Sequence, residues 1–189
     1  MLVKVIVFVT IAIAGGLGTS WYMIEKGSRL TTRTAGPWVT WVSAGRPQAD
    51  PYTRAHHIRR GILPVSSALT QTFEAMTDSE GQALYSSCEY LVEGEEPQAF
   101  WSLSVFDESG RLISNQAERY SFNSTTLMHG PSPRIQIVVA RDARPGNWLP
   151  TGGGGRLSLH FQVDEAPSSL PGAEPSPPPL PVIRRIACR

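Results

Sequence analysis

The stretch AFWSLSVF, residues 99–106, alternates between two kinds of position along its whole length. Trp101, Leu103 and Val105 occupy one set of positions, and two serines lie between them. Side chains alternate between the two faces of a β-strand, so this pattern predicts a strand with one face against a core. The turn sequence DESG follows at residues 107–110 and leads into RLI at 111–113, which predicts a hairpin.

Similar strand-like segments lie on both sides of this hairpin. We expect them at residues 70–76, 87–92, 119–122, 134–141, 156–163 and 182–188. Together these make some eight short strands at intervals of roughly ten residues, which is typical of an antiparallel sandwich or barrel. The 17 Gly and 16 Pro agree with this, because both residues interrupt helices. The predicted fold class is therefore all-β, an antiparallel β-sandwich.

An uncharged segment precedes this region, VIVFVTIAIAGGLGTSWYMI at residues 5–24. As a helix, twenty residues span ~30 Å, the thickness of the hydrocarbon core of a bilayer. Trp21 and Tyr22 lie near its end, where aromatic side chains favour the membrane interface. Residues 1–24 are therefore predicted to be a transmembrane anchor, followed by a polar linker at 25–35. The alternatives are a cleaved signal peptide and a buried soluble helix.

The charges that flank this segment favour a cytoplasmic domain. Lys4 lies before the segment, whereas Lys26, Arg29 and Arg33 follow it. By the positive-inside rule, the side with more Lys and Arg tends to be cytoplasmic.

The two cysteines, Cys88 and Cys188, favour the opposite orientation. Their even number and the lack of metal-binding spacing predict one disulfide, which persists in an oxidising compartment. Such a bond would secure a last strand that would otherwise fray, while two free thiols are the alternative. We follow the cysteines and expect a single-pass membrane protein with its domain outside the cytoplasm.

Three other segments have clear local signals. Asp50-Pro51 predicts the start of a short helix that runs to about Arg60, because Asp caps free amides and Pro is tolerated at the first position. Seven prolines between residues 167 and 181 predict an extended connector. Residues 145–155 contain NWLP and a run of four consecutive glycines, which predicts a long loop.

Several segments together resemble the DUF1214 family, a bacterial family of domains of unknown function. They are FWSLSVFDESGRLI (100–113), RYSF (119–122), NWLP with the glycine run and a strand (147–159), GPW (36–38) and ADPYTRA (49–55). The resemblance implies a jelly-roll-like sandwich at residues 36–189 and brings no established activity, catalytic residue or cofactor. The chain departs from the family pattern at His56-His57 and at FQVDEAP, residues 161–167.

Catalytic and metal signatures are weak in this sequence. A Gly-x-Ser-x-Gly elbow and metal-binding His or Cys spacings are missing, so the catalytic residues are unknown, and no metal site or cofactor is expected. His56, His57, His129 and His160 are interpreted as surface or turn residues. The glycine run enters a strand rather than a helix, which argues against a phosphate loop. Asn123-Ser124-Thr125 matches a glycosylation pattern that is frequent by chance.

With the resemblance to a bacterial family, the expected location is the bacterial inner membrane, single-pass, with the domain on the periplasmic side. The functional expectation is a non-enzymatic envelope module that binds a glycan, a lipid or a protein. Trp148 and Asn147 are candidate binding residues because exposed loop aromatics suggest a ligand, and Trp101 is a further candidate, with core packing as its alternative. The other hypothesis is a hydrolase or lyase of unrecognised type acting on envelope or polysaccharide material, with Asp50, Arg54 and His57 as its constellation. The net charge of +1 argues against a nucleic-acid partner. Ligand and oligomeric state are not predicted.

Overall fold

The computed structural model describes residues 1–130, 134–153, 155–164 and 178–188. The chain forms two compact units. The helical unit comprises Met1–Arg33 and Trp41–Ser67, and the sandwich unit comprises Thr34–Thr40 and Ala68–Arg189. Most of the predicted proline-rich connector, at residues 165–177, lies outside the described part of the chain.

The helical unit contains both helices of the described chain, α1 (Leu2–Lys26) and α2 (Pro51–Arg59). Helix α1 is long and apolar enough to cross a membrane, and none of its residues is buried within the protein. It ends at Gly27, whose φ of 69° is accessible to glycine at little cost. Helix α2 begins after Asp50, whose carboxylate accepts hydrogen bonds from the amides of Tyr52 and Thr53. The predicted short helix and its cap are therefore confirmed.

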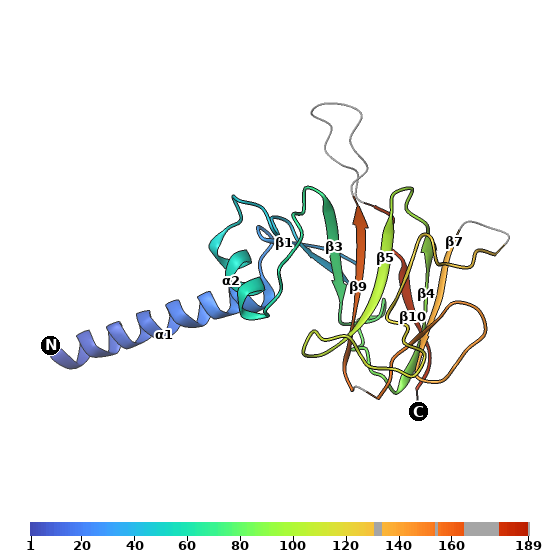
Figure 1. Ribbon diagram of the computed structural model, residues 1–189. Coiled ribbons are helices and arrows are strands. Elements are labelled where there is room, and N and C mark those ends of the chain that lie inside the picture. The colour runs from blue at the N-terminus through green and yellow to red at the C-terminus, as the bar shows by residue number, and fades with distance from the viewer. Residues whose placement is uncertain (131–133, 154, 165–177, 189) are drawn as a thin grey trace. The chain divides into compact units, whose positions relative to one another are not determined.

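The β-structure forms two sheets, and all but one of the strand pairings described are antiparallel (Figure 1). One sheet has six strands, in the order β1 (Thr32–Ala35), β2 (Trp38–Trp41), β3 (Thr70–Ala75), β9 (Leu157–Asp164), β5 (Trp101–Asp107) and β6 (Ser121–Asn123). The other has four, in the order β10 (Val182–Cys188), β4 (Cys88–Glu95), β7 (Arg134–Ala140) and β8 (Trp148–Pro150).

A hydrophobic core joins residues from both sheets. In the six-stranded sheet, Leu103 pairs with Phe161, which also pairs with Phe73, so three apolar side chains lie in one row across the sheet. In the four-stranded sheet, Ile183 pairs with Val92, and Val92 pairs with Ile137. All six side chains are at most 5% exposed and belong to one core cluster. The predicted all-β, sandwich-like fold is confirmed, whereas its jelly-roll connectivity stays a prediction.

Strand β10 is held to the sandwich unit at several points. The predicted Cys88–Cys188 disulfide is present and joins the first residue of β4 to the last residue of β10. Just before β10, the carbonyl of Pro181 accepts a 2.7 Å hydrogen bond from the indole of Trp38. Pro181 also packs close to Gly94, where an added Cβ would lie 2.9 Å from the Cα of Pro181.

Two local predictions were wrong. Residues 111–113 do not form a strand, because the turn closes with a single bridge between Phe106 and Leu112. The predicted loop contains β8, which pairs in parallel with β7 through Trp148–Val138 and its neighbours. In addition, the segment at 25–35, which is predicted as a linker, contains the end of α1 and the whole of β1. These elements are short or lack an alternating pattern, so local sequence gives little sign of them.

Candidate binding groove

A groove of about 340 Å³ lies in the sandwich unit, on β4, β7 and the loops beside them. Strand residues at its base alternate with core residues, so they point away from the core. The loop residues come from two segments, 128–130 and 145–147. Its lining combines apolar and polar side chains with two glycines: Leu91, Met128, His129, Gly130, Arg134, Gln136, Val138, Pro145, Gly146 and Asn147.

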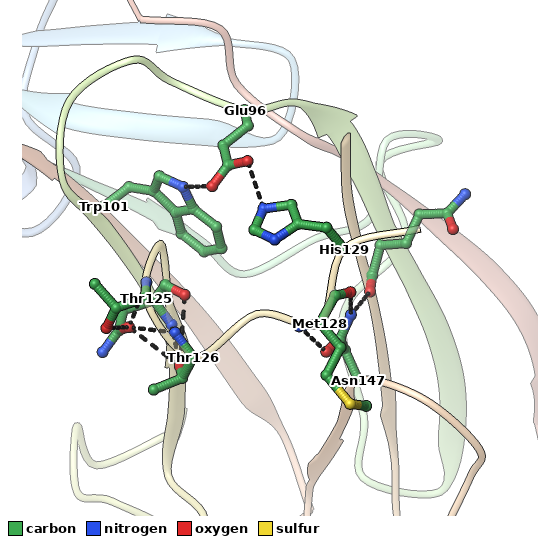
Figure 2. A network of polar contacts seen from close by, with 9 residues as sticks. Glu96, Trp101, Thr125, Thr126, Met128, His129 and Asn147 are labelled. Carbon is green, nitrogen blue, oxygen red and sulfur yellow. Dashed lines mark hydrogen bonds and ion pairs between the residues drawn. The ribbon is translucent and has the colours of Figure 1, made fainter. Parts of the chain in front are cut away.

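Asn147 fixes the two loops to β7, as Figure 2 shows. Its side-chain amide donates to the carbonyls of Met128, at 2.8 Å, and Gln136, at 3.1 Å. Its side-chain oxygen accepts from the amide of Met128 at 2.8 Å. Asn147 is only 8% exposed, so these contacts satisfy a polar group that burial would otherwise penalise. The structure thus places this predicted site residue in the groove wall, where it positions the loop that carries Met128.

A carboxylate–imidazole pair lies next to this loop. Glu96 accepts a 2.9 Å hydrogen bond from the indole of Trp101, and its other oxygen lies 2.8 Å from Nε2 of His129 (Figure 2). The His129 side chain is 39% exposed, whereas that of Glu96 is 16% exposed. Glu96 therefore links a buried core residue to an accessible imidazole. Sequence reasoning missed this pair, because 33 residues separate its members.

The two predicted tryptophans have different surroundings. Trp101 is fully buried between the sheets, 5.7 Å from the ring of Phe161, which agrees with core packing rather than with a ligand platform. Trp148 is partly buried, and its indole donates to the carbonyl of Ala140 at 2.9 Å. Trp148 is not among the residues that line the groove, although its neighbour Asn147 is. A role for Trp148 or Trp101 in binding stays a prediction.

The predicted catalytic constellation is used for local structure. Asp50 caps α2, Arg54 donates to the carbonyl of Pro47, and Nδ1 of His57 lies 2.8 Å from the carbonyl of Thr53. His56 was wrongly interpreted as a surface residue: it is 7% exposed, and its ring lies 4.2 Å from that of Trp41. The helix thus uses these side chains to build the helical unit.

The pKa of Asp50 gives a testable pH dependence. Burial raises this pKa, but hydrogen bonds from Thr53 and Tyr52 outweigh that effect and lower it below its ordinary 3.8. The capping contribution is therefore complete above pH ~4 and is lost as the pH falls through the folded-state pKa. We expect Asp50→Ala to cost about 1 kcal/mol at pH 7. Amide hydrogen exchange of α2 measures this, and Asp50→Asn is the control that keeps the cap without titrating.

Two other candidate motifs remain. One has a structural role, and the other lies partly outside the residues that the structure describes. Asn123 accepts hydrogen bonds from the amides of Thr125 and Thr126 and so stabilises a turn after β6 (Figure 2). The glycine run at 152–155 includes residue 154, which the structure does not describe. Among the described residues, His, Cys, Asp and Glu form no group of three or more that could hold a metal ion.

Comparisons with known proteins find a family of unknown function and solved structures of similar fold. A family model described as "Protein of unknown function (DUF1214)" matches residues 70–167. The structure resembles the VPA0106 protein from Vibrio parahaemolyticus, with a TM-score of 0.61 and 16% identity over 94% of this chain and 44% of that one. For a putative uncharacterized protein from Burkholderia cenocepacia, the TM-score is 0.42 and the sequence identity is 18%. The match covers 64% of this chain and 30% of that one. This chain thus spans less than half of either protein. No curated protein matches the sequence.

Proposed function

This chain belongs to the DUF1214 family, and we propose that it is a membrane-anchored, non-enzymatic module that binds an envelope ligand in the groove beside Asn147. Helix α1 serves as the anchor in this proposal, and the sandwich unit faces the periplasm. The disulfide supports an oxidising compartment, because such bonds rarely persist in a bacterial cytoplasm. The length and exposed apolar surface of α1 support the anchor.

The observation that carries the binding proposal is the rigid construction of the groove. Three hydrogen bonds of the Asn147 side chain, two donated and one accepted, hold the loop of Met128 in place, and β7 supplies the base. A site whose walls are fixed before binding loses less conformational entropy when a ligand enters. The groove is therefore better suited to a ligand than a loop surface of the same size.

The composition of the groove favours a glycan over a lipid. Arg134 and Gln136 are exposed hydrogen-bonding side chains, and Leu91 and Val138 are apolar side chains at the base. Sugars present hydroxyl groups at their edges and C–H groups on their faces, which suits a mixed lining. An acyl chain would instead require a predominantly apolar cavity.

The test is binding of the full-length protein, in detergent, to an array of neutral and acidic oligosaccharides. We expect Arg134→Ala with Gln136→Ala to weaken binding at least tenfold, since each lost hydrogen bond contributes about 0.5–1.5 kcal/mol and a charged one more. Arg141→Ala is the matched control on the same chain segment, because this exposed arginine lies outside the groove lining. Equal binding by wild type and the groove variant would contradict the proposal, as would no binding to any oligosaccharide.

One observation favours a second function, the hydrolase or lyase. The Glu96–His129 pair resembles the carboxylate–imidazole arrangement that orients a general base, and His129 lines the groove. In this case His129→Gln would abolish turnover of an oligosaccharide that the protein still binds. Chromatography of the bound oligosaccharide after long incubation distinguishes the two functions, because a binding module returns it unchanged.

A further inference from the structure

Charge is distributed unequally between the two units. The helical unit carries eight Lys and Arg residues against two acidic residues, a formal net charge of +6. The sandwich unit carries nine Lys and Arg residues against fourteen acidic residues, a formal net charge of −5. The near-neutral total therefore conceals a strongly basic unit, and this unit is the one that contains α1.

Seven of these eight basic residues follow α1's apolar stretch, and all seven side chains are exposed: Lys26, Arg29, Arg33, Arg46, Arg54, Arg59 and Arg60. Only Glu25 and Asp50 offset them. Of these two, Glu25 forms a 2.6 Å ion pair with Arg59, and Asp50 caps α2. The basic surface therefore has little acidic neutralisation within its own unit.

Large apolar side chains are exposed among these charges. Leu30 is 90% exposed, Ile58 77% and Leu63 97%. Leu30 follows Arg29 directly, and Ile58 precedes Arg59, the last residue of α2, and Arg60. Exposed basic and apolar side chains close together are typical of surfaces that lie at the boundary between lipid headgroups and acyl chains.

Helix α2 is fixed against the end of α1. His56 Nδ1 lies 2.8 Å from the carbonyl of Ile24, and the guanidinium of Arg59 lies 3.8 Å from the ring centre of Trp21. With the Arg59–Glu25 ion pair, these contacts hold α2 at residues 21–25. Trp21 and Tyr22 occupy the part of α1 where a spanning helix reaches the headgroups. Helix α2 and its basic residues would therefore lie at the level of the headgroups.

We propose that residues 26–33 and 54–65 form a surface that binds the anionic phospholipid headgroups of the bilayer crossed by α1. This proposal rests on the proposed function in one respect, since it requires α1 to be a membrane anchor. The basic side chains attract lipid phosphates, and Leu30, Ile58 and Leu63 enter the interfacial layer. The helical unit is thereby attached to the bilayer surface, in addition to its anchoring by α1.

The test uses full-length protein in nanodiscs of phosphatidylcholine alone or mixed with an equal amount of phosphatidylglycerol. We expect backbone amides of residues 51–66 to exchange at least fivefold more slowly in the anionic nanodiscs. Each basic residue near an anionic surface changes binding about fivefold, so Lys26→Gln with Arg29→Gln and Arg33→Gln should bring the two rates within about twofold. Salt at about 1 M, where the Debye length is ~3 Å, should have the same effect on wild type.

The matched control removes three charges from the sandwich unit, Arg111→Gln, Arg141→Gln and Arg156→Gln, and should keep the fivefold difference. Equal exchange in the two nanodiscs, by protein that resists alkaline extraction from the bilayer, would overturn the lipid proposal and leave the anchor intact. Protein that fails to enter either nanodisc would overturn the anchor and, with it, the lipid surface. An equal effect of the control and test variants would also overturn the proposal. The exchange rates would then depend on the net charge of the protein and not on the position of the basic residues.

Discussion

Replacing Cys188 with Ser is expected to lower the free energy of unfolding by about 4 kcal/mol. The disulfide closes a loop of 100 residues, and in the chain-entropy model such a cross-link stabilises by restricting the unfolded chain. Cys188 is exposed at the end of β10, so the substitution itself removes little packing. Denaturant unfolding of the full-length protein, followed by the fluorescence of buried tryptophans such as Trp101, measures the change.

The control for this experiment is Ala187→Ser, an exposed position on the same strand, with an expected effect below about 0.5 kcal/mol. Thiol labelling of the wild-type protein unfolded without reductant provides an independent check. We expect no reactive thiols under those conditions. Two reactive thiols in each chain would contradict the disulfide and remove the main support for an oxidising compartment.

Arg185→Ala is expected to cost about 3–5 kcal/mol, because it leaves the buried carboxylate of Asp78 without its ionic partner. Asp78 is 1% exposed, and its Oδ2 atom lies 3.0 Å from Nη2 of Arg185, an ionic contact rather than a directed hydrogen bond. Its Oδ1 atom accepts from the amides of Glu80 and Gln82. Arg185 also donates to the side chain of Gln82 at 2.7 Å.

Arg184 provides a matched control on the neighbouring position of β10. It pairs with Glu93 at 2.7 Å, but its side chain is 59% exposed, and exposed ion pairs contribute about 0–1 kcal/mol. The same unfolding experiment on Arg184→Ala should therefore show a small loss. Similar losses for the two variants would mean that burial of Asp78 does not determine the stability of this end of the sandwich unit.

Much of the sandwich unit is predictable from sequence because its central strands have one buried face. Trp101, Leu103 and Val105 are all at most 3% exposed, as their alternation predicts. The disulfide is predictable for a different reason, since two cysteines allow only one intramolecular pairing.

The groove is not predictable in the same way, because it depends on contacts between distant segments. The sequence predicts Asn147 as a binding residue from its place in a loop. Its structural role in the groove wall depends on its hydrogen bonds to Met128 and to β7. Glu96 and His129 meet only after the strands have paired. Strand β8 is three residues long and ends at Pro150, so it is too short to show an alternating pattern. Parallel pairing with β7 identifies it only in the folded protein.

The pairing of β10 with β4 has a consequence for the order of folding. The two strands are about ninety residues apart, and β4 lies between β10 and β7 in its sheet. During synthesis one edge of β4 must therefore stay open until β10 has emerged, and Val92 at its centre cannot be covered by Ile183 before then. Non-local pairings of this kind form slowly and leave strand edges open to aggregation. We therefore expect newly synthesised chains to depend on a holding chaperone until β10 has docked.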